Sequence, residues 1–158
     1  MRARDIMTSP VHTVGPETSV ESVAEILAAK AITALPVVDD AGAVLGMVSE
    51  GDLLWHRVPS DPTAHLWRRL GREVQPPPRS VREVMSSGPV TTTPEADVAD
   101  VADMMLQRDV RSVPVVDGSR LVGIISRRDI LRAAVRGDEV LTAEVQRRLD
   151  EYGGVPSR

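Results

Sequence analysis

The sequence has no cysteine, no phenylalanine and a single lysine among its 158 residues. The lack of cysteine excludes disulfides, thiolate catalysis and cysteine-ligated zinc or iron–sulfur centres. Three scattered histidines (His12, His56 and His65) cannot form a conventional zinc site without carboxylate ligands, so we expect no metal. With only two Trp and one Tyr, the core must consist of Val, Leu, Ile, Met and Ala. Such a core suits thin β/α units better than a deep enzyme cleft.

Long apolar runs and an excess of positive charge are also missing. Nineteen basic and twenty-three acidic residues give a net charge of -4, which argues against a general nucleic-acid contact through phosphate neutralisation. No run approaches the length of a membrane span, and the first residues have no apolar segment of signal-peptide length. We therefore expect a cytoplasmic protein with neither a membrane nor a nucleic acid as partner.

What the sequence does contain is an internal repeat. Met7 and Met85 lie 78 residues apart, and this offset holds without a gap as far as Asp39 and Asp117. One residue is then lost in a turn, after which Gly46, Ser49, Asp52 and Leu54 match Gly123, Ser126, Asp129 and Leu131. Identities in register over half a chain indicate a duplication. We divide the chain into repeat 1 (1–55), a linker (56–80), repeat 2 (81–135) and a tail (136–158).

Each repeat has the pattern β-α-β-β-α. Apolar residues at helical spacing follow a proline, beginning at Val20 in repeat 1 and at Val98 in repeat 2. Two short strands joined by an Asp- and Gly-rich turn come next, and a second helix begins near Asp52 or Asp129. The expected strands are 35–39, 44–48, 113–117 and 121–125. One such unit leaves a sheet face uncovered, so we predict an α/β (α+β) fold in which the two repeats pack through their sheets.

The linker and the tail have no counterpart in the repeat. The linker ends in three prolines (76–78), and its residues 65–72 predict a short basic helix. Trp67 and its neighbouring arginines could contact nucleic acid or an acidic partner, but an amphipathic helix lying over the repeats is the favoured interpretation. Residues 138–149 predict a charged helix.

The pattern Gly-h-h-Ser-x-x-Asp, where h is apolar, occurs once in each repeat, at the end of a strand where a helix opens. One interpretation is a capping box, in which Ser49 or Ser126 bonds the helix amides and the following Asp reaches back. The other is a ligand site. A helix N-terminus attracts anions, and a carboxylate beside it can accept ribose hydroxyls, as in dinucleotide-binding folds. The spacing alone is compatible with both.

Taken together, these motifs resemble a tandem pair of cystathionine-β-synthase-type (CBS) domains, also called a Bateman module. The motifs are Leu35–Asp39 (LPVVD), Gly46–Leu54 (GMVSEGDLL), Val113–Asp117 (VPVVD) and Gly123–Leu131 (GIISRRDIL). The resemblance implies two pseudo-symmetric units with two clefts between them, often assembled as a homodimer. Members commonly bind adenine nucleotides (AMP, ADP or ATP) or S-adenosylmethionine and regulate another protein. The tail resembles the opening helix of a BON domain, which follows CBS pairs in some bacterial proteins.

The resemblance also assigns ligand-binding roles. Asp52 and Asp129 would hold ribose hydroxyls, with Ser49 and Ser126 near ribose or phosphate. Arg111 and Arg128 would bind phosphate, although Arg111 could equally be a surface residue, and Arg127 is a further expected contact. The remaining expected contacts are Ile32, Thr33, Leu35 and Pro36 in repeat 1, Val110, Val113 and Pro114 in repeat 2, and Thr13, Val14, Thr91 and Thr92 in the first strands. For Val110 and Val113, plain core packing is the favoured alternative.

The two repeats differ where a phosphate would lie. Repeat 2 has Arg127 and Arg128 after its serine, whereas repeat 1 has Glu50 and Gly51. Because a carboxylate repels a phosphate, we predict that the cleft of Ser126 and Asp129 dominates. The function expected from all this is a non-catalytic regulatory module that binds an adenosine-type ligand and signals to a partner or across a homodimer. The alternative is a ligand-free scaffold for dimerisation, in which both Ser-x-x-Asp motifs are only caps.

Overall fold

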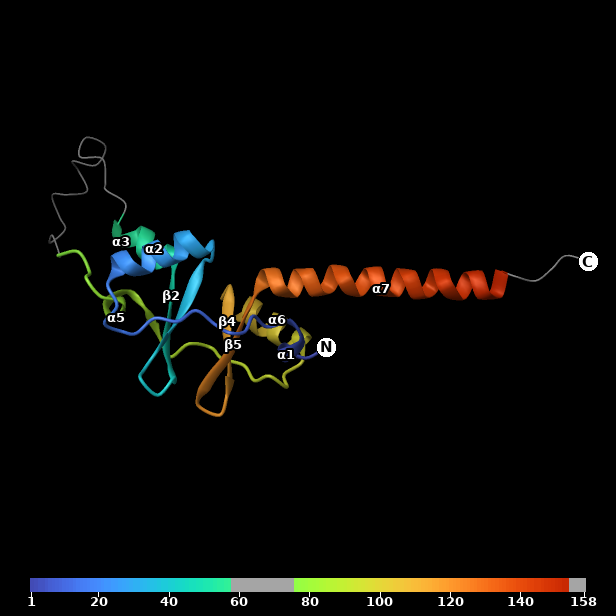
Figure 1. The fold of residues 1–158 in the computed structure, drawn as a ribbon, viewed down its shortest axis with the longest axis horizontal. Coiled ribbons are helices and arrows are strands. Elements are labelled where there is room, and N and C mark those ends of the chain that lie inside the picture. The colour runs from blue at the N-terminus through green and yellow to red at the C-terminus, as the bar shows by residue number, and fades with distance from the viewer. Residues whose placement is uncertain (58–75, 154–158) are drawn as a thin grey trace, which may run out of the picture.

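A computed structural model describes residues 1–57 and 76–153. Two antiparallel sheets lie side by side, one in each repeat, with helices on their outer sides (Figure 1). One sheet has the strand order β1-β2-β3 and the other consists of β4 and β5. The predicted α/β repeats packed through their sheets are thus confirmed. The basic helix expected at 65–72 lies outside the described residues.

Repeat 1 consists of α2 (Val20–Lys30), β1 (Ala34–Val38), β2 (Val44–Ser49) and α3 (Glu50–Arg57). Helix α2 begins after Ser19, whose hydroxyl accepts the backbone N–H of Ser22 at 3.1 Å. It ends at Ala31, which has a left-handed backbone (φ 52°). The apolar face predicted from the spacing is the one that is buried.

Repeat 2 consists of α6 (Val98–Gln107), β4 (Ser112–Asp117), β5 (Arg120–Ser126) and α7 (Arg127–Gly153). The Asp97 side chain caps α6 by accepting the N–H of Ala99 at 2.8 Å. Helix α7 runs without a break for 27 residues and extends away from the body of the molecule (Figure 1). The helix predicted at 138–149 is therefore the continuation of the last helix of the repeat. None of the helices described is long and apolar enough to cross a membrane.

The first strand expected in each repeat is reduced to a single parallel bridge. Val14 accepts the N–H of Val38 at 2.9 Å, and its own N–H donates to Pro36 at 3.1 Å. Thr92 makes the same two bonds in repeat 2. A proline follows two residues later in both repeats and has no N–H to extend the ladder. These segments therefore contact the sheet at one point only.

The short helices α1 (Ala3–Ile6) and α5 (Val81–Val84) are exchanged between the repeats. Val81 and Val84 belong to the core of repeat 1, together with Val20, Val23 and Leu35. Ala3 belongs in the same way to the core of repeat 2, with Val101, Met105, Val113 and Ile125. The backbone N–H of Ala3 donates to Ala96 at 2.8 Å, and that of Val81 donates to Thr18 at 2.9 Å. The core of each repeat is thus completed by the first helix of the other repeat.

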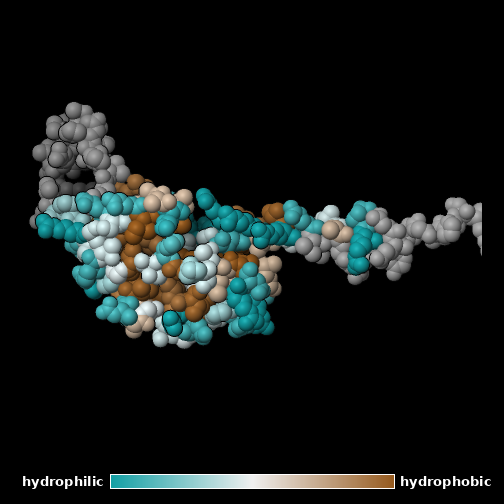
Figure 2. Space-filling view, in the orientation of Figure 1, coloured by the Kyte–Doolittle hydropathy of each residue, from teal (hydrophilic) through white to brown (hydrophobic). Residues whose placement is uncertain are grey.

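The residues after these helices continue onto the edges of the same sheets. Strand β3 (Ser86–Ser87) pairs with β2 opposite Gly46 and Met47, while Thr8 forms a single bridge with Ile124 of β5. The sheet of repeat 1 therefore has a short strand from the other repeat along one edge, and the sheet of repeat 2 has a single bridge at the equivalent place. Figure 2 shows apolar residues gathered in the middle of one face of the body, with hydrophilic residues around them and along α7.

Candidate functional site

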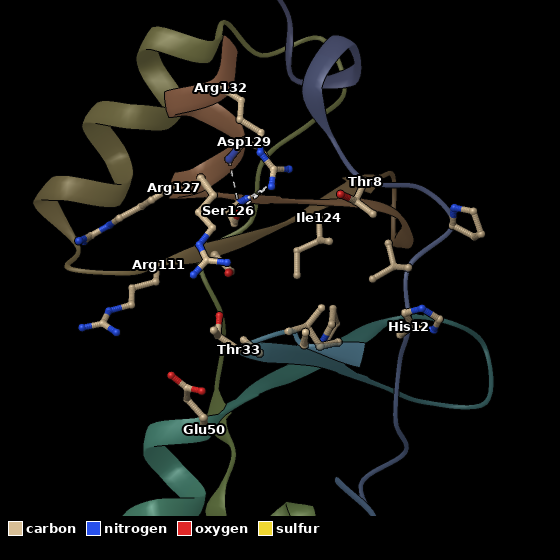
Figure 3. Close-up of a pocket in the computed structure, with 18 residues that line it drawn as sticks. Thr8, His12, Thr33, Glu50, Arg111, Ile124, Ser126, Arg127, Asp129 and Arg132 are labelled. Carbon is tan, nitrogen blue, oxygen red and sulfur yellow. Dashed lines mark hydrogen bonds and ion pairs between the residues drawn. The ribbon is translucent and has the colours of Figure 1, made fainter. Parts of the chain in front are cut away.

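A cavity of about 470 Å³ lies between the two repeats and is lined by residues of both (Figure 3). This volume falls in the range of sites for small molecules. Its apolar lining residues are Pro10, Val11, Ala31, Ile32, Ala34, Pro36 and Ile124. Its polar and charged lining residues are Thr8, His12, Thr33, Glu50, Arg111, Ser112, Ser126, Arg127, Arg128, Asp129 and Arg132. Four arginines against two carboxylates give the cavity an excess of positive charge.

The Asp129 carboxylate lies at the N-terminus of α7 and borders this cavity. Its Oδ2 atom accepts the backbone N–H and the hydroxyl of Ser126, both at 2.7 Å. The N–H of Asp129 donates to the Ser126 hydroxyl at 3.4 Å, so the two residues form a reciprocal cap. The Asp129 side chain is 15% exposed, and its other oxygen, Oδ1, lies 3.9 Å from Arg132. The capping box is therefore present, and the carboxylate still has an oxygen without a hydrogen-bonded partner at the cavity.

Asp52 and Ser49 make the same cap in repeat 1. Oδ2 of Asp52 accepts the N–H of Ser49 at 2.8 Å and its hydroxyl at 3.0 Å, and the N–H of Asp52 donates to the Ser49 hydroxyl at 3.3 Å. This pair does not line the cavity of Asp129. The duplicated motif has thus produced one local geometry in two different settings.

Arg127 lines the cavity but is bonded to the protein backbone. Its Nε donates to the carbonyl of Val110 at 3.0 Å, and its Nη2 donates to that of Met105 at 3.4 Å. The same nitrogen lies 3.4 Å from the carboxylate of Asp109. These bonds hold the turn between α6 and β4 against the start of α7. The side chains of Arg111 and Arg128, by contrast, are exposed at the cavity.

The cavity brings together eight of the residues expected to bind a ligand: Ile32, Thr33, Pro36, Arg111, Ser126, Arg127, Arg128 and Asp129. The other ten lie elsewhere: Thr13, Val14, Leu35, Ser49, Asp52, Thr91, Thr92, Val110, Val113 and Pro114. In β1 the cause is strand alternation, because Ala34 and Pro36 face the cavity whereas Leu35 and Val37 face the core. Val14 and Val113 are likewise core residues.

Ten of the eighteen lining residues were not among the expected ligand contacts: Thr8, Pro10, Val11, His12, Ala31, Ala34, Glu50, Ser112, Ile124 and Arg132. Thr8 to His12 cross from repeat 2 to repeat 1, and no local pattern indicates where such a connection runs. Arg132 could have been found, because it follows Asp129 by three residues and therefore shares its helix face. Glu50, expected to disfavour phosphate in the Asp52 cleft, lines the Asp129 cavity as well.

The described residues offer no group of three or more His, Cys, Asp or Glu side chains that could hold a metal ion. His12 lines the cavity and is exposed, while the side chain of His56 and the whole of His65 are outside the description. The absence of cysteine removes the soft ligands that a zinc or iron–sulfur site would use. The side chains that line the cavity can form hydrogen bonds, ion pairs and apolar contacts.

Fold and cavity together define a duplicated α/β module built around a cleft between its repeats. The chain belongs to the CBS domain family, whose model matches residues 3–58 and 81–136. The tandem CBS pair predicted from the sequence motifs is thereby confirmed.

Among its relatives is the chloroplastic CBS domain-containing protein CBSX2 of Arabidopsis thaliana, which is 31% identical over 149 residues. The match covers 84% of this chain and 63% of the relative, so the chain spans less than two thirds of that protein's length. The CBS domain-containing protein YhcV of Bacillus subtilis is 32% identical over 127 residues, covering 80% of this chain and 81% of YhcV.

Solved structures of the same fold contain nucleosides. CBSX2 in complex with AMP superimposes with a TM-score of 0.71 at 31% identity, covering 87% of this chain and 98% of that one. The CBS domain pair of protein MJ0100, in complex with 5′-methylthioadenosine and S-adenosyl-L-methionine, gives a TM-score of 0.70 at 26% identity, with coverages of 87% and 98%.

Proposed function

We propose that this chain is a regulatory module that binds an adenosine-type ligand in the cavity between its repeats and is not itself an enzyme. The observation that carries the proposal is the position of Asp129, which caps α7 while presenting Oδ1 at a cavity with apolar walls. The complexes of CBSX2 with AMP and of the MJ0100 pair with 5′-methylthioadenosine and S-adenosyl-L-methionine support the ligand class.

Each part of such a ligand has a matching part of the cavity. Ile32, Ala34 and Ile124 offer apolar surface to a flat base. Asp129 would accept the ribose hydroxyls, since a carboxylate is the stronger kind of acceptor. The start of α7 carries a partial positive charge, and Arg111 and Arg128 add full charges nearby. A phosphorylated nucleoside satisfies all three groups.

The Asp129 cavity is proposed to be the dominant of the two clefts. Arg127 and Arg128 follow the serine of repeat 2, whereas Glu50 and Gly51 follow that of repeat 1. Because Glu50 also lines the Asp129 cavity, it weakens this preference, while the four arginines outweigh it. A titration that requires two equal sites would contradict this part of the proposal.

A signal requires that the ligand bind two states of the protein with different affinity. Helix α7 offers a route, because Asp129 lies in its first turn and the helix, 27 residues long, extends away from the body. A ligand that stabilises the start of α7 changes how the repeats hold this helix, and a regulated partner or a second copy of the chain would detect its position. We place this partner in the cytoplasm.

The second candidate function is a ligand-free scaffold for dimerisation. It is favoured by one observation, namely that both Ser-x-x-Asp motifs make complete caps. In that case Asp129 stabilises α7 and does nothing else. The two functions therefore differ in whether nucleosides bind at all.

Thermal unfolding against AMP, ADP, ATP, S-adenosylmethionine and NAD at matched concentrations separates these functions. The protein must first be shown to be free of co-purified nucleotide. A ligand at one hundred times its Kd stabilises the folded state by about 2.7 kcal/mol, which raises the Tm by a few degrees. A selective shift that Asp129→Asn abolishes supports the regulatory module. If no ligand shifts the Tm, the scaffold function stands instead.

A further inference from the structure

Arg132 competes for the carboxylate that the proposed ligand would use. It lies one turn beyond Arg128 on α7, and its Nη1 is 3.9 Å from Oδ1 of Asp129. The other oxygen, Oδ2, accepts both bonds from Ser126. In Figure 3 the Arg132 side chain lies over Asp129 and Ser126 at the edge of the cavity. Both oxygens of Asp129 thus face a donor of the protein itself.

The ion pair with Arg132 is loose. The distance of 3.9 Å exceeds that of a hydrogen bond, and the Arg132 side chain is 71% exposed. Exposed pairs of this kind contribute little stability, so the guanidinium can leave Asp129 readily when a better partner arrives. Ser126, by contrast, holds Asp129 at 2.7 Å and stays in place.

We propose that Arg132 makes this cavity select phosphorylated adenine nucleosides over neutral ones, an inference that rests on the proposed function. The hydroxyls of a neutral nucleoside must compete with Arg132 for Oδ1 and give the arginine nothing in return. A ligand that carries a phosphate supplies a second anion, to which the guanidinium turns when the ribose takes Oδ1. Arg132 thereby disfavours the binding of a neutral nucleoside and favours the binding of a phosphorylated one.

The other charges of the cavity act in the same direction. Arg111, Arg127 and Arg128 also line it, against Glu50 and Asp129. A cleft of one sign of charge concentrates ligands of the opposite sign. S-adenosylmethionine carries a positive sulfonium where a nucleotide carries its phosphate, so it is disfavoured. 5′-Methylthioadenosine, which has no charge there, lies between the two.

The test compares AMP with adenosine, which differ by the phosphate alone. Their Kd values are measured by calorimetry on the full chain for the unaltered protein, Arg132→Gln and Arg136→Gln. Arg136 is the matched control, because it is exposed on the next turn of α7 and does not line the cavity. Arg132→Gln should weaken AMP about fivefold or more and leave adenosine unchanged or tighter. Arg136→Gln should change neither ligand by more than about twofold.

Weaker binding of AMP without weaker binding of adenosine is the signature, since a structural role of Arg132 would weaken both together. Equal weakening of AMP and adenosine by Arg132→Gln overturns the inference while leaving the proposed function intact. The same holds if S-adenosylmethionine binds the unaltered protein more tightly than AMP does. If the unaltered protein binds none of the three, the proposed function fails and the inference fails with it. Asp129→Asn, which replaces the ionised carboxylate by a neutral amide with a single acceptor oxygen, should weaken AMP and adenosine alike.

Discussion

Asp52 and Asp129 occupy the same position in the two repeats and hold the hydroxyls of Ser49 and Ser126 at 3.0 and 2.7 Å. Only Asp129 of this pair borders the cavity between the repeats. The two carboxylates are therefore matched in their capping role and differ in their access to a ligand.

This relationship gives a prediction that separates capping from ligand binding. Asp52→Ala and Asp129→Ala should each lower the free energy of unfolding by about 0.5–2 kcal/mol, the usual range for a lost helix cap. Asp129→Ala should in addition abolish the Tm shift produced by AMP, whereas Asp52→Ala should preserve it. Urea denaturation and thermal unfolding measure the two effects separately. Loss of the AMP shift in both variants would place the ligand elsewhere.

Gly46 and Gly123 form a second matched pair, and replacing each with alanine should lower the stability of the protein to different extents. A Cβ at Gly46 would collide with the backbone carbonyl oxygen of Ser86, whereas one at Gly123 would meet side-chain atoms of Met7, including Cγ at 2.9 Å. A backbone in a paired strand cannot move as a methionine side chain can. We expect Gly46→Ala to destabilise by about 2 kcal/mol or more and Gly123→Ala by less.

Met7→Ala provides the control for this comparison. In the Gly123→Ala background it removes the collision, so it should cost less stability there than in the unaltered protein. If Met7→Ala lowers the free energy of unfolding equally in the two backgrounds, the Met7 side chain does not collide with the Cβ of the alanine at position 123.

Val81 should stabilise repeat 1 although it is the first residue of repeat 2 in the sequence. Its side chain is fully buried in the core of repeat 1, so Val81→Ala should destabilise by about 2 kcal/mol. Hydrogen exchange should accelerate at amides of α2 more than at those of α6. Leu106→Ala, at a position on α6 that is 69% exposed, should stay within about 0.5 kcal/mol. Faster exchange confined to α6 would contradict the exchange of segments.

Glu83 should make stability depend on pH in the acidic range. The backbone N–H groups of Ser80 and Arg79 donate to its carboxylate and hold the pKa of Glu83 below its ordinary value of 4.5. A lowered pKa contributes stability that is present above pH 4.5 and is lost as the pH falls through the folded-state pKa. The urea midpoint of the unaltered protein should therefore exceed that of Glu83→Gln at pH 7 and approach it at about pH 3. Glu25→Gln, at an exposed position of α2, controls for the loss of one charge.

Much of the fold could be predicted because the duplication presents each signal twice. The strand expected at 35–39 is observed at Ala34–Val38, and the one expected at 44–48 at Val44–Ser49. Helical spacing from Val20 identified the buried face of α2. These features depend on periodicity and turn chemistry within about ten residues, which a sequence displays directly.

The features that escaped prediction depend on contacts between distant segments. Ala3 and Val81 look like ordinary starts of their own repeats, and no local pattern indicates that they pack into the opposite cores. The candidate site was predicted in part for the same reason. The Ser-x-x-Asp motif located the polar end, while Thr8 to His12 reach the cavity only through the path of the chain between repeats. Leu35 and Val113 were expected beside a ligand because strand register, which decides between core and cavity, was unknown.

The exchange of α1 and α5 has a consequence for how each repeat folds. A lone repeat would lack the residues that complete its hydrophobic core, since in this chain they come from the first helix of the other repeat. Two separate chains of one repeat each could complete their cores only by exchanging their N-terminal segments, which produces a domain-swapped dimer. The two repeats of this chain should therefore unfold together as one unit, since neither contains all the residues of its own core.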